Sequence, residues 1–199
     1  MARPFRDQID EGIVDRAAAL FARRGFAKTS VQDVADAVGL SKAGLLHHFP
    51  SKDALHDAVW THAGALGQQL LDQVGVLPPG AERDRRALEV LVDIALAHPG
   101  LVALLLTPLA QGDPDAGPPE AAAAGAAALG AFGVDPGAPV SERAVRVIGA
   151  LTALAALTLA AHARDESTTW RRHIVVTCFD ALGHRSPGAT PSVPDQVEA

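Results

Sequence analysis

The sequence predicts an all-α protein in two parts: a small N-terminal unit of three helices, and a larger helical body joined to it by a long helix. Alanine is abundant, aromatic residues make up only 4% of the chain and tyrosine is absent, a composition that favours helices over sheets. Apolar residues recur at helical spacing between Gly and Pro residues. With 48% hydrophobic and 20% charged residues, the 199-residue chain can bury a sizeable core.

The Gly and Pro residues divide the chain into about nine helical blocks. The first is expected over residues 7–24, ending at Gly25, and short blocks at 31–38 and 42–49 end at Gly39 and Pro50. A long block at 52–74 precedes a Pro-Pro-Gly break at 78–80. Five further helices are expected at 82–97, 101–111, 119–132, 140–164 and 168–183, and residues 185–199, rich in Pro, Ser, Gly and Thr, are expected to form a disordered tail.

Residues 30–49 have the pattern of two short helices joined by a tight turn. Ser30 and Asp33 resemble a capping box, with Asp in place of the usual Glu or Gln. Gly39 can supply the positive φ that closes a helix, and Ser41 can cap the next one. If Leu45 points inward, the rotation of 100° per residue turns Ala43, Gly44 and His47 outward. This helix-turn-helix therefore presents a narrow surface that fits the DNA major groove.

The start of the next helix adds a candidate phosphate-binding group. Pro50 ends the preceding helix, Ser51 can cap the next, and Lys52 stands at its first position. Free backbone amides and an ammonium group together attract phosphate. Lys42, in the first turn of its helix, can reach a phosphate or a guanine edge. An ordinary three-helix core without a role in DNA binding is the alternative interpretation of the pattern taken alone.

Residues 7–67 resemble the DNA-binding domain of the tetracycline-repressor (TetR) family. The resemblance rests on Ala19-Leu20-Phe21 with Gly25-Phe26, residues 29–35 (TSVQDVA), residues 38–42 (VGLSK), Leu45 with His48-Phe49, and residues 51–55 (SKDAL). It implies a DNA-binding domain at 7–67, with its helix-turn-helix at 30–49, and a ligand-binding and dimerisation domain at 68–184. Leu46 departs from the family, which commonly has a DNA-contacting tyrosine there. The residues expected to contact DNA are Thr29, Ser30, Gln32, Lys42, Ala43, Gly44, His47, His48 and Lys52.

Charge and cysteine content fit this interpretation. The net charge is −6, but residues 1–60 carry eight Lys/Arg and eight Asp/Glu, and all three lysines lie in this neutral segment. The single cysteine, Cys178, excludes an internal disulfide and fits a reducing compartment. The N-terminus lacks an apolar signal segment, and the longest uncharged apolar run, 147–161, is shorter than the ~20 residues that span a bilayer. A cytoplasmic protein without membrane contact is expected.

No catalytic or metal-binding pattern is visible in the sequence. The adjacent His47 and His48 point about 100° apart on a helix and cannot share one ion. Cys178 stands among apolar residues, which favours a buried thiol over a nucleophile. We therefore expect neither an enzyme nor a cofactor.

The helix at 140–164 is apolar on all sides, which predicts a dimer. Gly149, Ala153, Ala156 and Ala160 form a stripe of small residues, and a helix that is apolar all round must be buried all round. The helix at 168–183 also has adjacent apolar stripes, one of Trp170, Ile174, Cys178 and Ala181 and one of Val175, Phe179 and Leu182. Two such helices from each chain would make a four-helix interface, as the family resemblance also implies, and a twofold dimer predicts a palindromic DNA site. A large monomeric core is the alternative.

The resemblance further implies a small-molecule cavity in the body and, most commonly in this family, repression that the ligand relieves. The cavity is expected to be lined by residues 101–106 with Thr107, Pro108 and Gln111, and by the inner face of residues 140–162. Its mostly aliphatic wall would suit an uncharged or weakly polar hydrophobic effector. A helical ligand-binding protein with a weakened DNA-binding head is the alternative, and Leu46 is its support. The residues expected to line the cavity or contact the effector are His98, Leu104, Thr107, Gln111, Thr158 and His162.

Overall fold

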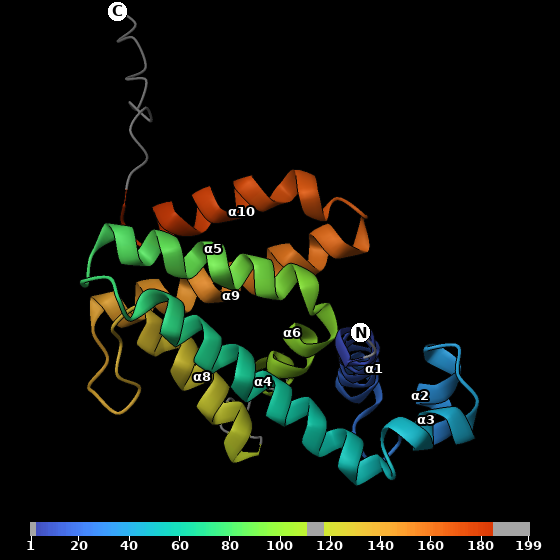
Figure 1. The fold of residues 1–199 in the computed structure, drawn as a ribbon. Helices are drawn as coiled ribbons and strands as arrows, with labels where there is room; N and C mark the ends of the chain where they lie inside the picture. Colours follow the sequence, from blue (N-terminus) through green and yellow to red (C-terminus); the bar gives the residue numbers. More distant parts are fainter. Residues whose placement is uncertain (1–2, 111–117, 185–199) are drawn as a thin grey trace, which may run out of the picture.

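The computed structural model describes residues 3–110 and 118–184, and within these residues the only regular secondary structure is helical, which confirms the fold class. The chain folds into a small head, made by the first three helices and the start of the fourth, and a larger body (Figure 1). The helices are α1 (Arg3–Arg24), α2 (Val31–Ala37), α3 (Lys42–His48), α4 (Lys52–Val74), α5 (Ala81–Ala97), α6 (Pro99–Leu105), α7 (Thr107–Ala110), α8 (Pro119–Ala131), α9 (Glu142–Ala163) and α10 (Ser167–Ala181).

Most helix ends match the Gly and Pro signals, and two regions differ. Helix α1 begins at Arg3, four residues before the expected start. The helix expected at 101–111 is two short helices, α6 and α7, and α6 meets α5 at a bend of 105° centred on His98. Gln111 and the tail at 185–199 lie outside the described residues.

The head is held by apolar side chains from α1, α2, α3 and the first three turns of α4. Ala17 and Ala18 of α1 are fully buried, and Leu45 of α3 and Leu55 of α4 are each 1% exposed. Small alanines let α1 approach its neighbours closely, and the two leucines fix the orientation of α3 against α1 and α4. The head is therefore a rigid platform for α3.

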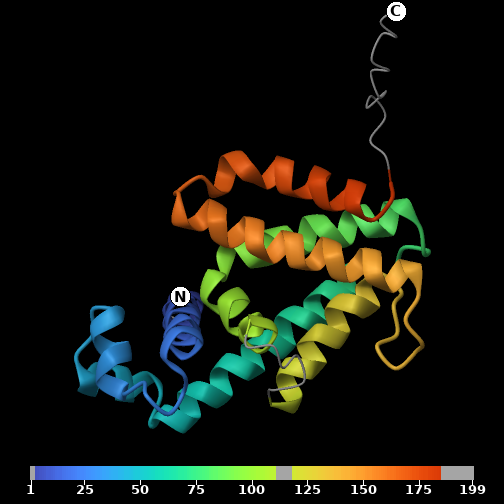
Figure 2. The same ribbon diagram turned by 180° about the vertical axis from the view of Figure 1, so that it is seen from behind.

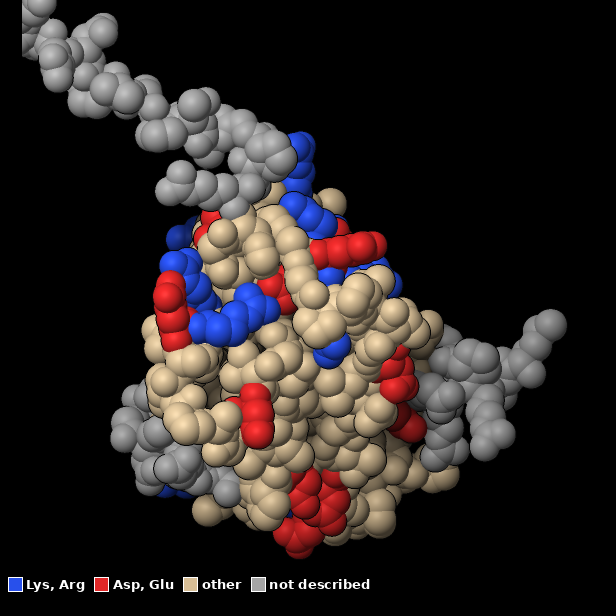
Figure 3. Space-filling view, turned by 90° about the vertical axis from the view of Figure 1, so that its left-hand side faces the viewer, with Lys and Arg blue, Asp and Glu red and all other residues tan. Residues whose placement is uncertain are grey.

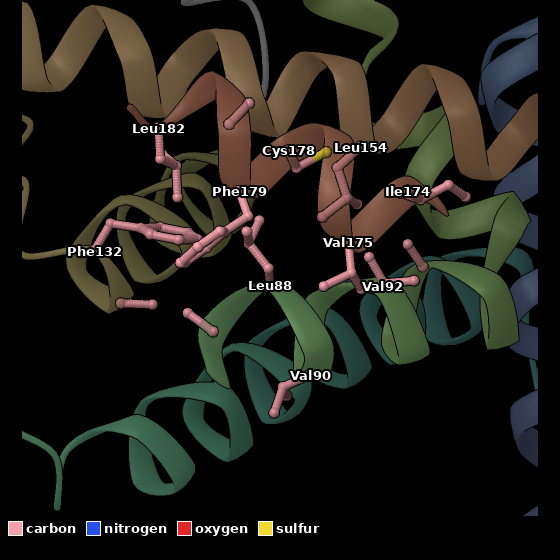
Figure 4. Packing of buried hydrophobic residues seen from close by; sticks show 14 of the residues in the cluster. Leu88, Val90, Val92, Phe132, Leu154, Ile174, Val175, Cys178, Phe179 and Leu182 are labelled. Atoms are coloured by element: carbon pink, nitrogen blue, oxygen red, sulfur yellow. The ribbon is translucent and has the colours of Figure 1, made fainter. Parts of the chain in front are cut away.

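The body stacks α5, α9 and α10 over α4 and α8, as the front and back views show (Figures 1 and 2). Leu88 and Val92 of α5 meet Val175 and Phe179 of α10 and Leu154 of α9 in one continuous cluster (Figure 4). All five side chains are at most 6% exposed.

The cores of the head and body meet along α4. Ala63 belongs to the head core and Leu70, two turns later, to the body core. Leu101 of α6 joins the head core although it lies far along the chain. The expected division at 67/68 thus falls between the two cores on α4, but the head core also includes part of α6.

The end of the body away from the head carries a buried ion pair. Asp84, 1% exposed, accepts hydrogen bonds from Arg143 Nη2 at 2.6 and 2.7 Å and lies 2.6 Å from His184 Nε2. These contacts join the starts of α5 and α9 to the end of α10. Figure 3 shows this face of the molecule, where Arg side chains lie beside Asp and Glu in the upper part and acidic side chains lie toward the bottom.

Helix α9 is long and apolar enough to cross a bilayer by length and composition alone, with a mean hydropathy of 1.9 over its most apolar 18 residues. The apolar run expected to be too short is thus part of a 22-residue helix. Helix α9 buries Val147, Ala150, Leu154 and Ala161 inside the body, and 39% of its most apolar stretch is buried there. These buried residues give α9 a structural role in the core.

Candidate nucleic-acid interface and body cavity

The start of α2 is fixed by the expected capping box. The Ser30 hydroxyl accepts a hydrogen bond from the Asp33 backbone N–H at 3.1 Å, and the Ser30 N–H donates to Asp33 Oδ2 at 2.8 Å. Arg24 at the end of α1 donates to the other oxygen of Asp33 at 2.9 Å. Hydrogen bonds from the side chain and backbone of Ser30 lower the pKa of the Asp33 carboxyl below its usual value, so it is ionised at neutral pH and joins α2 to α1.

The turn and α3 follow the expected geometry. Gly39 has a φ of +71° and closes α2, and the Ser41 hydroxyl accepts from the Gly44 N–H at 3.0 Å to cap α3. Leu45 is buried, whereas Ala43 and His47 are exposed and Gly44 is partly exposed. A Cβ on residue 44 would lie 3.2 Å from the Ser41 hydroxyl oxygen, so glycine suits the capped turn. The outer face of α3 is therefore nearly bare of side chains.

Three residues expected to contact DNA make polar contacts within the head. Thr29 is 1% exposed and its hydroxyl donates to the Gly25 carbonyl at 2.9 Å, so its side chain cannot reach a phosphate. Lys52 Nζ donates to the Phe26 carbonyl at 3.0 Å and lies 4.1 Å from the centre of the Phe26 ring. His48 Nδ1 lies 2.6 Å from Asp10 Oδ1 and joins α3 to α1. The partners of Lys52 and His48 lie 26 and 38 residues away, so the local sequence pattern could not reveal these two contacts, whereas Thr29 bonds within its own turn.

The remaining residues of the expected interface are on the surface. Ser30, Gln32 and Lys42 are exposed, and Gln32 Nε2 donates to Asp36 Oδ1 at 2.6 Å. Lys28, in the turn before α2, is also exposed and was not singled out from the sequence. Ser30, Gln32, Lys42, Ala43 and His47 thus remain as surface candidates for DNA contact.

A close joint between α1 and α6 links the head to the body. The two oxygens of Asp15 accept backbone hydrogen bonds from Gly100 at 3.1 Å and Leu101 at 2.9 Å, which caps α6. A Cβ on residue 100 would lie only 2.0 Å from the Asp15 backbone oxygen. Only glycine permits this approach, and sequence reasoning missed the joint because its partners lie 85 residues apart.

The body contains a cavity of about 480 Å³, within the size range of small-molecule sites. Its wall comes from α5, the α6–α7 segment, α8 and α9, and His98 and Thr152 are its only polar side chains among the described residues. Alanines and a glycine on α8 leave room for it. Representative wall residues are Leu91, Ile94, His98, Leu101, Val102, Leu105, Ala121, Gly125, Ala128, Ile148, Leu151, Thr152 and Ala155.

Of the described residues expected to contact an effector, only His98 lies on this wall. Leu104 turns toward the head core, and the Thr107 hydroxyl donates to the Ala103 carbonyl at 3.0 Å. Thr158 is 1% exposed on the core side of α9, where its hydroxyl donates to the Ala155 carbonyl, and His162 is exposed to solvent. Packing determines the rotation of α6 and α9 about their axes, and this rotation turns other residues of the same helices toward the cavity.

Of the four small residues expected on one stripe of α9, two lie on its outer face, Ala160 is partly exposed and Ala153 packs against the body core. Gly149 and Ala156 are exposed, and Val145 is 58% exposed. Helix α10 differs from expectation. Its apolar residues Ile174, Val175, Cys178, Phe179 and Leu182 are buried inside the same chain, and its exposed residues are mainly polar, including Arg172, His173 and Thr177.

Comparison with known proteins identifies relatives of both parts. The family model "Bacterial regulatory proteins, tetR family" matches residues 13–59. The repressor KstR2 of Rhodococcus jostii is 47% identical over 47 residues, which span 24% of this chain and only 23% of that repressor. An uncharacterized HTH-type transcriptional regulator of Mycobacterium tuberculosis is 32% identical over 145 residues, 71% of this chain and 72% of that protein. The structure of the TetR-family regulator PfmR of Thermus thermophilus superimposes with a TM-score of 0.53 at 23% identity, over 88% of this chain and 96% of that one.

Proposed function

Because this chain belongs to the TetR family of bacterial transcriptional regulators, we propose that it binds specific DNA sequences through α3 and regulates transcription in the cytoplasm. The observation that carries the proposal is the outer face of α3, where Ala43 and His47 are exposed while Leu45 anchors the helix below. A helix with so little side-chain bulk can approach the floor of the major groove closely. The relatives are named as transcriptional regulators, which supports binding and regulation rather than catalysis.

We assign different roles to the exposed residues of this surface. Lys42, with a flexible cationic side chain in the first turn of α3, contacts phosphate. Ser30 and Gln32 contact phosphate from the start of α2, and His47 reads base edges. Thr29, His48 and Lys52 position the helices and act on DNA binding only through the fold, as their internal hydrogen bonds indicate.

We further propose that the protein works as a homodimer that a small-molecule effector releases from DNA. The exposed Gly149 and Ala156 on α9 allow close approach of a second α9, with the polar outer face of α10 at the edge. A twofold dimer would recognise a palindrome with half-sites about 34–36 Å apart. The cavity is the effector site, and a ligand favouring another spacing of the heads would weaken DNA binding by about 1–3 kcal/mol.

Selection of bound fragments from random-sequence DNA tests the proposal. The protein should enrich a palindrome; His47→Ala should change the enriched sequence, and Lys42→Ala should weaken all sequences alike and lower the salt slope by about one. His162→Ala, an exposed histidine of the body, serves as control and should change neither. Failure to enrich any sequence, or equal and sequence-independent losses for His47→Ala and Lys42→Ala, would contradict the proposal.

A ligand-binding protein with a weakened head is the second candidate, favoured by Leu46. Its partly exposed side chain stands beside His47 and cannot hydrogen-bond to a phosphate. Salt dependence separates the two candidates, because phosphate contacts give a steep decline of affinity with salt. A flat salt dependence with retained ligand binding would favour the second.

A further inference from the structure

The polar groups of the body cavity are concentrated on two residues. His98 stands where α5 meets α6, and Thr152 lies on α9; the rest of the described wall is Ala, Gly, Leu, Ile, Val and Pro. No Lys, Arg, Asp or Glu among the described residues lines it. A charged group brought into such a wall loses its hydration without gaining a counter-ion, which is strongly unfavourable.

His98 is held firmly in place by the chain on both sides. Its backbone N–H donates to the Ile94 carbonyl at 2.9 Å, and its carbonyl accepts from the Val102 N–H at 3.1 Å. These bonds fix the backbone of His98 at the 105° bend between α5 and α6, and with it the position of the Cβ that carries the ring. The ring lies against His62 of α4, with centroids 4.7 Å apart and planes at 71°. The imidazole therefore has a limited range of positions at one end of the cavity.

The surroundings of His62 determine the charge of this polar end. His62 Nε2 is buried without a hydrogen-bond partner among the described residues. Burial, and next the neighbouring His98 ring, lower the pKa of His62, so the ring is neutral at neutral pH. The carboxylates of Glu11 and Asp15 on α1 act on the same ring. A neutral His62 ring thus lies against His98, with the carboxylates of Glu11 and Asp15 near it, and among the described residues this wall offers no Lys or Arg to pair with an anion.

We propose that the cavity takes an uncharged amphiphile with a hydrocarbon body and one hydroxyl or carbonyl group that hydrogen-bonds to His98, the specificity-determining residue. The hydrocarbon body lies between the small residues of α8, such as Ala121, Gly125 and Ala128, and the aliphatic face of α9 formed by Ile148, Leu151 and Ala155. Dispersion and hydrophobic burial supply most of the affinity, and the single hydrogen bond sets the orientation. The inference rests on the proposed effector site and adds the chemical class of its ligand.

Three ten-carbon probes that differ only in their end group test the ligand class: 1-decanol, decanoate and decylammonium. Titration calorimetry on the full chain at pH 8 should give an affinity for 1-decanol at least about tenfold above that for either ion. His98→Leu should weaken 1-decanol about threefold to tenfold, the factor of one hydrogen bond, and His98→Gln should restore most of it. Ala128→Phe, which places a phenyl ring in the cavity, should strongly weaken binding, and His162→Leu outside the cavity should leave it unchanged.

Equal or tighter binding of an ion, no binding of 1-decanol, or an unchanged affinity in His98→Leu would overturn the inference. If His98→Leu does not fold, the comparison of the three probes on the wild type and on His98→Gln still decides. DNA binding of the same preparations is measured separately. Retained DNA binding without the preference for 1-decanol refutes only the ligand class, whereas that preference without DNA binding refutes only the regulator.

Discussion

Gly100→Ala is expected to destabilise the protein by about 3 kcal/mol, because α1 and α6 are in contact at this residue. The added Cβ would lie 2.0 Å from the Asp15 backbone oxygen, 2.9 Å from the Asp15 carbonyl carbon and 3.0 Å from the Ala19 nitrogen. All three are backbone atoms that cannot rotate away. Since Cβ contacts below 3.0 Å essentially do not occur, the helices must separate by about 1 Å (3.0 minus 2.0).

This separation lowers the free energy of unfolding in two ways. Overpacking costs typically 1–3 kcal/mol. In addition, the hydrogen bonds from Gly100 and Leu101 to the Asp15 carboxylate, now 3.1 and 2.9 Å, would stretch toward 4 Å and lose most of their strength. Bonds to a charged acceptor contribute about 1.5–3 kcal/mol each, and partial rearrangement brings the total to about 3 kcal/mol.

Urea unfolding followed by far-UV circular dichroism, at one fixed protein concentration, measures the effect. Gly12→Ala in α1 is the matched control, because its Cβ would meet nothing within 4 Å. As an exposed helical position, it should gain about 0.5–1 kcal/mol. If Gly100→Ala unfolds within about 0.5 kcal/mol of the wild type, α1 and α6 do not form this joint in solution and the reasoning fails.

Three further predictions concern buried polar groups. Arg143→Met leaves the buried Asp84 with His184 alone and should lower the free energy of unfolding in urea by about 3 kcal/mol. Arg146→Met, at an exposed ion pair, should lower it by less than about 0.5 kcal/mol. Equal losses for the two variants would contradict this prediction. Burial raises the pKa of the Cys178 thiol to about 11, so at pH 8 only about one molecule in a thousand carries a thiolate. A disulfide reagent such as DTNB should therefore react slowly until the protein unfolds. Immediate reaction would show that the thiol is exposed. Because the folded state lowers the pKa of His62, the unfolded state binds more protons, and the free energy of unfolding should fall as the pH drops through about 6.5. His62→Leu should reduce this fall between pH 7.5 and 5.5, and an unchanged slope would assign it to other groups.

The helices of the head could be predicted because their end signals are local. Ser30 and Ser41 cap α2 and α3 through residues three positions away, and Gly39 sits at the positive φ that its lack of a Cβ permits. The break between α6 and α7 also has a local signal, because Pro108 cannot be accommodated inside a continuous helix and stands in the first turn of α7. The prediction of one helix at 101–111 passed over this signal.

The roles of individual site residues were harder to predict. Residue type suggests that Thr29 and Lys52 contact phosphate, yet their polar atoms bind the carbonyls of Gly25 and Phe26. In α6, the sequence cannot say whether Leu104 or Leu105 faces the cavity, because both are apolar and only the position of α1 decides. The sequence thus indicates the fold and the outer face of α3, and the tertiary contacts determine the remaining assignments.

The side chain of Leu101 separates the head core from the body cavity, so at this point the wall between them is one side chain thick. Leu101 is 4% exposed, belongs to the head core and also forms part of the cavity wall. The head is therefore not a continuous piece of chain that could be cut out after α4 and grafted onto another sensor, since the graft would leave a hole where Leu101 fits. Exchange of heads between regulators of this architecture should succeed only when α6 travels with the first four helices.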